Sequence, residues 1–141
     1  MTTADQTSVL FFNAAFYTAF ATRDIQAMEQ LWSKDKTIIC THPGWQPLTG
    51  REEVLESWRN ILSNPEAPEV ACHGERAVVY GDFAIVTCIE QLSDGQSAPE
   101  FLTATNVFVR AGTRWVLVHH QAGPANVDAR TVEKKEKPAL N

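Results

Sequence analysis

Apolar residues recur at helical spacing in the first quarter of the chain and at strand spacing in its second half. Phe12, Phe16 and Phe20 are four positions apart, so they share one face of a helix. The same spacing continues over residues 8–32, and the polar pair Arg23-Asp24 is expected to divide this segment into two helices. The first helix therefore presents a stripe of phenylalanines to another apolar surface.

Strand patterns dominate the chain after Pro68. Turn residues such as Gly81-Asp82 separate them, which is typical of consecutive antiparallel strands. The predicted strands cover residues 70–80, 83–92, 101–110 and 115–122, preceded by a short strand at 36–41 and a helix at 51–62. Because helices and strands are segregated, the pattern predicts an α+β fold in which a curved antiparallel β-sheet wraps around the N-terminal helices. The concave face of such a sheet is a suitable site for a small ligand.

Composition narrows the possible functions. The 141 residues carry a net charge of −5 with a pI near 5.3, which argues against nucleic-acid binding. No apolar stretch reaches the roughly 20 residues that a membrane span needs. The three cysteines form no CxxC pair and no signal peptide is apparent, so reduced thiols in a cytoplasmic protein are expected. Residues 1–126 are predicted to form one domain, and the charged segment 127–141 a disordered tail.

The loop His42-Pro43-Gly44-Trp45 is the most distinctive segment, because prolines exclude helix and central strand and leave an imidazole and an indole on a shaped turn. Together with other short motifs it resembles the NTF2-like superfamily, and its SnoaL-like members in particular, over about residues 8–123. The other matching pieces are Phe16-Tyr17-x-Ala19-Phe20, Leu31-Trp32, Gly50-Arg51-Glu52, Ser57-Trp58, Ala104-Thr105-Asn106-Val107-Phe108, Trp115 and His119-His120. The resemblance implies a cystatin-like, NTF2-like cone and a homodimer formed through the outer face of the sheet.

Ketosteroid isomerases are the best-understood relatives within this resemblance. They use an Asp base together with a Tyr and a protonated Asp that stabilise an oxyanion. Aligned on the shared motifs, Phe16 takes the tyrosine position and Cys40 the position of the base, while the second acid falls near Thr105 or Asn106. The Tyr, Asp and Asp set is therefore absent from this sequence. Tyr17 lies about 100° around the helix from Phe16 and is expected to point away from the cavity.

Histidines are the candidate polar groups of the cavity. His119 and His120 are adjacent on a strand, so they face opposite sides of the sheet and cannot jointly bind a metal. The resemblance places Val118 and His120 inside the cone, and His42 has the same strand parity as Cys40. Both His42 and His120 are consistent with hydrogen-bonded framework residues or with an acid–base pair, since imidazole titrates near neutrality. No metal and no cofactor is predicted.

Other candidate positions have two interpretations. Trp45 and Trp58 form either a lid packed over the core or a surface on which a planar ligand stacks. Matching to the late-strand acid directs Thr105 inward and Asn106 outward. Glu90 is expected to be exposed near a strand end, although a buried carboxyl with a raised pKa would serve as a general acid.

The leading hypothesis is a SnoaL-like protein whose conical pocket binds a small apolar molecule. Catalysis would be cofactor-free isomerisation, cyclisation or dehydration, with His42 and His120 as catalytic groups. The predicted ligand-binding residues are Phe16, Cys40, Trp45, Trp58, Thr105 and Val118. The alternative is a non-catalytic association module that uses the fold to dimerise or to bind a partner, because fold does not settle function.

Overall fold

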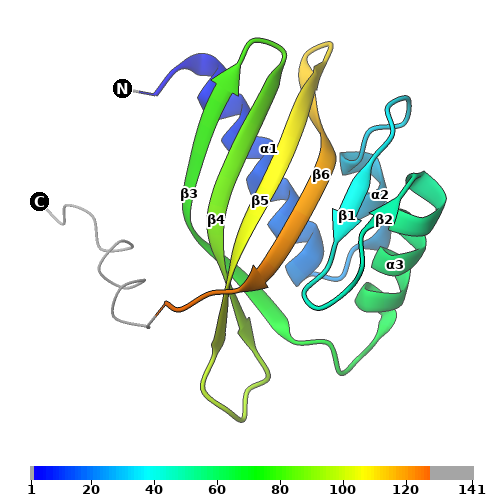
Figure 1. Cartoon of the computed structure of the whole chain (residues 1–141), viewed down its shortest axis with the longest axis vertical. Helices are drawn as coiled ribbons and strands as arrows, with labels where there is room; N and C mark the ends of the chain where they lie inside the picture. Colours follow the sequence, from blue (N-terminus) through cyan, green and yellow to red (C-terminus); the bar gives the residue numbers. More distant parts are fainter. Residues whose placement is uncertain (1, 128–141) are drawn as a thin grey trace, which may run out of the picture.

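Three helices and a six-stranded sheet make up the computed structural model, which describes residues 2–127 (Figure 1). The helices are α1 (Ala4–Ala21), α2 (Ile25–Leu31) and α3 (Arg51–Ser63). The strands are β1 (Ile39–Thr41), β2 (Leu48–Thr49), β3 (Glu69–Tyr80), β4 (Phe83–Ser93), β5 (Glu100–Ala111) and β6 (Arg114–Pro124). This is the predicted α+β fold, and the predicted tail from residue 128 onward lies outside the described residues. No helix in the described part is long and apolar enough to cross a membrane.

Sheet order is β2-β1-β6-β5-β4-β3, and β3 to β6 form the predicted antiparallel meander. The sheet is not entirely antiparallel, because β1 pairs in parallel with β6 and aligns Cys40 with His120. Strand β2 was not predicted, since two residues between Pro47 and Gly50 are too few to show a period. The parallel pairing brings the His42 loop to the end of β6.

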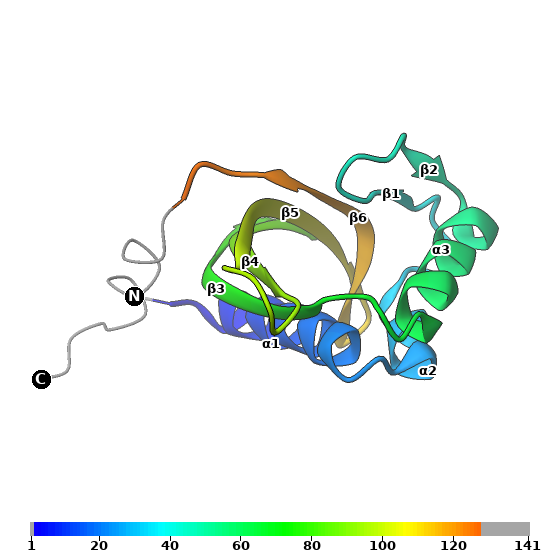
Figure 2. The same ribbon diagram turned by 90° about the horizontal axis from the view of Figure 1, so that it is seen from below.

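Two irregularities bend the meander. Strand β3 has one extra residue between His73 and Arg76, beside Gly74 with its φ of +64°, and β6 has one extra residue at Val118. Such bulges increase the twist of a strand and let a sheet curve. Figure 2 shows β3 to β6 curling over α1, so that the helix closes the concave side of the sheet.

The helix boundaries follow local capping. Helix α1 begins at Ala4, earlier than predicted, because the Thr3 hydroxyl accepts a hydrogen bond from Gln6 N at 3.0 Å and the Gln6 side chain accepts one from Thr3 N at 2.9 Å. The predicted break between the helices is confirmed. There Arg23 has a φ of +58° and the Asp24 carboxylate caps α2 by accepting from Ala27 N at 3.0 Å.

The buried side of α1 differs from the predicted phenylalanine stripe. Phe16 is fully buried, whereas Phe12 and Phe20 are only partly buried. Asn13 and Tyr17 are buried as well, because the curved sheet contacts a wide arc of the helix. The concave core of the protein therefore contains polar groups that hydrophobic periodicity does not reveal.

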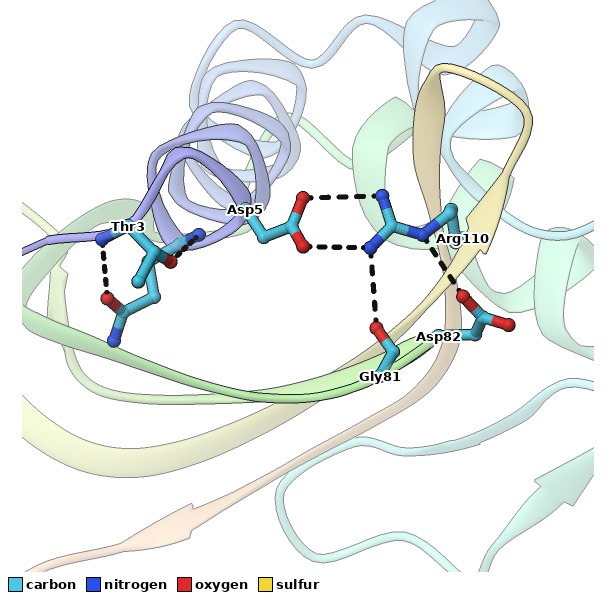
Figure 3. A network of polar contacts seen from close by, with 6 residues as sticks. Thr3, Asp5, Gly81, Asp82 and Arg110 are labelled. Carbon is cyan, nitrogen blue, oxygen red and sulfur yellow. Dashed lines mark hydrogen bonds and ion pairs between the residues drawn. The ribbon is translucent and has the colours of Figure 1, made fainter.

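Arg110 connects one end of the sheet to the start of α1 through ion pairs (Figure 3). Its guanidinium donates to the carboxylates of Asp5 and Asp82, with nitrogen–oxygen distances of 2.9 and 3.2 Å. The hydrogen bond from Arg110 also lowers the pKa of Asp5. These contacts lie at the end of the cone where β3 turns into β4. They leave the opposite end of the cone available for a ligand site.

Candidate functional site

A cavity of about 210 Å³ lies at the end of the cone away from the Arg110 contacts. Its only polar lining residues in the described chain are His42, Glu90 and His120, apart from the indole of Trp45. The remaining wall is apolar and consists of Phe20, Pro43, Ile61, Ala67, Pro68, Leu92 and Leu102. A larger surface hollow of about 540 Å³ is formed by side chains along α2 alone and contains no buried polar group. The cavity is therefore the candidate functional site.

His120 faces this cavity and His119 faces the other side of the sheet, as the sequence predicted. The Nδ1 atom of His120 lies 2.5 Å from Asn106 Oδ1. Because an amide oxygen only accepts, Nδ1 carries the proton and Nε2 keeps its lone pair. Burial, with smaller effects from His42 and His119, lowers the pKa of His120 to about 3, so the ring is neutral at physiological pH.

Asn106 is fully buried and organises the polar core, which corrects the expectation that it points outward. Its amide nitrogen donates to Asn13 Oδ1 at 2.9 Å and to the Tyr17 hydroxyl oxygen at 3.2 Å. Asn13 Nδ2 is buried and has no hydrogen-bond partner among residues 2–127, and an unpaired buried donor reduces the stability of the fold. Placing Asn106 inward moves Thr105 outward, because successive residues of a strand face opposite sides.

Tyr17 and Glu90 meet inside the cone. The Tyr17 hydroxyl donates to Glu90 Oε2 at 2.6 Å and lies 3.2 Å from Cys88 Sγ. The expectation that Tyr17 points away is wrong, because the sheet covers the arc of α1 that includes both residues 16 and 17. The expectation that Glu90 is exposed is also wrong: its exposed fraction is 2%. Its parity with the buried Val86 and Cys88 on β4 was a usable signal.

Glu90 is the cavity group that titrates near neutral pH. Burial raises its pKa to about 7, and the hydrogen bond from Tyr17 opposes that rise. Burial and the neighbouring Glu90 raise the pKa of Tyr17 well above its ordinary value, so the phenol stays protonated. Glu90 Oε2 lies 3.8 Å from His120 Nε2, but the two groups are not an ion pair at neutral pH because the imidazole is uncharged.

His42 is fixed from the helix side. Its Nε2 lies 2.8 Å from Ser57 Oγ, and Ser57 donates its own proton to Val54 O at 2.6 Å. The serine oxygen therefore accepts from His42, which leaves the lone pair on Nδ1. Burial lowers the pKa of His42 to about 4. Burial also raises the pKa of the neighbouring Cys40 to about 12, so this thiol is not a nucleophile at neutral pH.

The two tryptophans have different positions. Trp45 lines the cavity, has an exposed fraction of 48% and packs edge-on to His42 with ring centroids 4.8 Å apart. Trp58 is buried, and its ring centroid lies 5.0 Å from that of Phe20 and 4.8 Å from that of His42. Trp45 is thus a side chain at the mouth, whereas Trp58 is part of the wall behind it.

The predicted site residues differ in how close they lie to the cavity. His42, Trp45 and His120 line the cavity. Phe16, Cys40 and Trp58 are buried but lie behind the lining residues, so their contact with a ligand stays a prediction.

Thr105 and Val118 do not line the cavity. Thr105 borders a hollow on the outer face together with His119 and Gln121. Val118 is the extra residue of the β6 bulge and packs against the core without lining the cavity, so its contact with a ligand stays a prediction. No group of three or more His, Cys, Asp or Glu side chains within residues 2–127 is arranged to hold a metal ion.

Comparison with known proteins identifies the family. The model of the SnoaL-like domain matches residues 9–126. The chain belongs to the SnoaL-like family. A candidate dehydratase of the NTF2-like family from Streptomyces avermitilis is 34% identical with a TM-score of 0.78, over 87% of this chain and 97% of that chain. The resemblance to the NTF2-like superfamily is therefore confirmed, and other solved structures of this fold are described as cystatin-like.

Two further relatives belong to other functional classes. A candidate calcium/calmodulin-dependent protein kinase type II association domain from Thiobacillus denitrificans is 31% identical with a TM-score of 0.74, over 82% of this chain and 93% of that chain. The F-box protein SKIP8 of Arabidopsis thaliana is 29% identical over 126 residues, which are 89% of this chain and 53% of that protein. This SnoaL-like chain spans about half the length of that curated relative.

The substitution Glu90→Gln tests the buried carboxyl. The unfolded chain loses the Glu90 proton near the ordinary pKa of 4.5, whereas the folded protein keeps it up to about pH 7, so stability falls as the pH rises between these values. At about pH 8 the variant is expected to be more stable than the wild type by up to ~3 kcal/mol, and at about pH 4 equally stable. Denaturant unfolding at the two pH values measures this difference.

The stability difference between Glu90→Gln and the wild type reports on Glu90 alone, because His42 and His120 are present in both proteins. Their lowered pKa values act in the opposite sense, reducing stability as the pH falls through 6.5. An equal stability difference between variant and wild type at both pH values would contradict the assignment.

Trp58→Ala and Trp45→Ala form a matched pair for separating core from mouth. Removing the buried Trp58 side chain is expected to lower the free energy of unfolding by about 3–5 kcal/mol. Removing the half-exposed Trp45 is expected to change it by less than about 1 kcal/mol. Urea unfolding curves give both numbers, and similar losses in the two variants would show that Trp45 is also a core residue.

Proposed function

We propose that the protein binds a small, largely apolar molecule in the cavity and transfers protons to or from it without a cofactor. The observation that carries the proposal is the convergence of His42, Glu90 and His120 on one cavity whose other walls are apolar. Isomerisation, cyclisation and dehydration are the reaction classes that such acid–base chemistry serves.

Glu90 refines the roles of the two histidines in this proposal. Both imidazoles are neutral at physiological pH, so neither is a proton donor there, and their lowered pKa values make them weak bases. Glu90, with a pKa of about 7, is present in both protonation states and is therefore the best-matched general acid or base. His120 and His42 position the ligand through their lone pairs. The similarity to a candidate dehydratase supports the reaction class.

Screening a metabolite library by thermal shift is expected to find ligands that raise the melting temperature, because they bind only the folded protein. For a ligand that is converted, Glu90→Gln is expected to lower kcat by about 10²–10⁴-fold. His120→Ala is expected to weaken binding and turnover, whereas His119→Ala, a change on the other face, serves as the control with little effect. Unchanged turnover in Glu90→Gln and His120→Ala would refute the assigned roles.

A second candidate function is association through the outer face of the sheet. Val78, Tyr80 and Phe83 are apolar residues of β3 and β4 with exposed fractions of 49%, 51% and 44%. The rings of Tyr80 and Phe83 stack there with centroids 5.1 Å apart. Apolar clusters of this kind mark interaction surfaces, and the similarity to a candidate association domain supports the same interpretation.

The outer face is expected to form a homodimer, which light scattering coupled to size-exclusion chromatography measures directly. Val78→Glu introduces a charge into the apolar cluster and should yield a monomer with an intact cavity. Gln26→Glu, an exposed change on α2, is the matched control and should remain a dimer. A monomeric wild type at the concentrations used would refute dimerisation.

A further inference from the structure

The cavity offers hydrogen-bond acceptors to its ligand. His120 donates its ring proton to Asn106 and His42 donates its ring proton to Ser57, so each ring keeps one unprotonated nitrogen. The third polar group is Glu90, which accepts from Tyr17. Among residues 2–127, no lysine or arginine lines the cavity. An anionic ligand would therefore meet no cation from this part of the chain and would lie beside the Glu90 carboxyl.

Glu90 also lacks a counter-ion among the neighbours that the structure describes. The titratable groups around it come from α1, β1, β3, β4, β6 and the loop after β1, and none carries a positive charge at neutral pH. They are Tyr17, Cys40, Cys72, Cys88, His120 and His42. Burial raises the pKa of Glu90 because the ionised carboxylate is removed from water without a neighbouring cation. A bound cation would offset the free-energy cost of ionising this buried carboxyl.

Geometry near Glu90 suits a shared donor. Its Oε2 atom and His120 Nε2 are 3.8 Å apart, too far for a direct hydrogen bond. A single nitrogen atom can nevertheless lie within hydrogen-bond distance of both acceptors. An alcohol has one O–H for the two, whereas a primary ammonium group has several N–H donors. The aromatic rings of Phe20 and Trp45 in the same wall also attract a cation.

The surface beside the cavity is acidic. Two surface hollows border it through Ala67, Pro68 and Leu92. They contain four carboxylates, those of Glu66, Glu69, Asp94 and Glu100. Arg23, the one cation that the described residues contribute there, donates to the carbonyl oxygens of Asn64 and Ala67. Together with the net charge of −5, this distribution raises the local concentration of cations near the mouth.

We infer that the cavity binds a small primary amine in its ammonium form, with the nitrogen hydrogen-bonded to Glu90 and His120 and the apolar body against Phe20, Trp45 and Leu102. The inference rests on the proposed function, because it takes the same cavity as the ligand site and adds the chemical class of the ligand. Below about pH 7, binding displaces the proton of the Glu90 carboxyl into solvent while the ammonium group keeps its own protons.

Three probes of nearly the same shape test the charge preference: benzylamine, benzyl alcohol and benzoate. Alkyl ammonium groups titrate near pH ~10, so benzylamine is a cation at about pH 8. Isothermal titration calorimetry of the wild type at that pH is expected to show benzylamine binding about tenfold or more tightly than benzyl alcohol, and no binding of benzoate. The affinity for benzylamine should rise from about pH 6 to about pH 8, with proton release at the lower pH, whereas that for benzyl alcohol should not.

Two variants test whether Glu90 is responsible for the preference for benzylamine. Glu90→Gln is expected to abolish the preference for benzylamine over benzyl alcohol. Glu56→Gln makes the same chemical change on the exposed side of α3 and should leave the preference intact. A preference that survives in Glu90→Gln overturns the inference, as does a wild type that binds benzyl alcohol or benzoate as tightly as benzylamine.

Failure of this inference differs from failure of the proposed function. Binding of benzyl alcohol without a preference for benzylamine rejects the ammonium site but keeps a ligand-binding cavity. If none of the three probes binds, the ammonium inference is rejected, and the metabolite screen decides independently whether the cavity binds any small molecule.

Discussion

Burial of the Glu90 carboxyl inside the cone is the constraint on which the polar core depends. A carboxyl group removed from water needs hydrogen-bond partners, and Tyr17 supplies one from a helix that lies 73 residues away in the chain. Asn106 then donates to Tyr17 and Asn13 while accepting from His120. These hydrogen bonds fix the orientation of Tyr17, Asn106 and His120 relative to one another. A buried network of hydrogen bonds makes a cavity wall more rigid, which suits a ligand site.

The residues that hydrogen-bond to the two cavity histidines determine which chemistry these histidines can perform. His120 and His42 are held by different partners, yet both present an unprotonated nitrogen and both have lowered pKa values. Burial therefore removes from imidazole the near-neutral titration that makes it a common general base. The same burial moves Glu90 into the neutral range. Proton transfer at this site consequently falls to a carboxyl group, although the sequence offered histidines as the obvious candidates.

Much of the architecture follows from local pattern. Periodicity and turn residues located the three main helices, the four long strands and the break at Arg23-Asp24. Alternation alone separated His119 from His120. Alternation also carried the information that Glu90 is buried with Val86 and Cys88, but a charged residue near a strand end was expected to be exposed. The error at Thr105 arose from a one-residue offset, which reverses the face of every residue of a strand, and local pattern does not specify such an offset.

The sequence by itself determined the class of fold, the family resemblance and the loop that carries His42 and Trp45, because these depend on spacing and turn chemistry within short segments. Tertiary structure decided which polar groups meet. The sheet curves through its bulges and covers a wide arc of α1, so Asn13 and Tyr17 enter the core beside Phe16. The parallel pairing of β1 with β6 brings His42 to the same cavity as His120. Hydrogen bonds between distant segments then fix the tautomers, and burial fixes the charges. Neither effect is visible in residue spacing, because both depend on what surrounds a side chain in the folded protein.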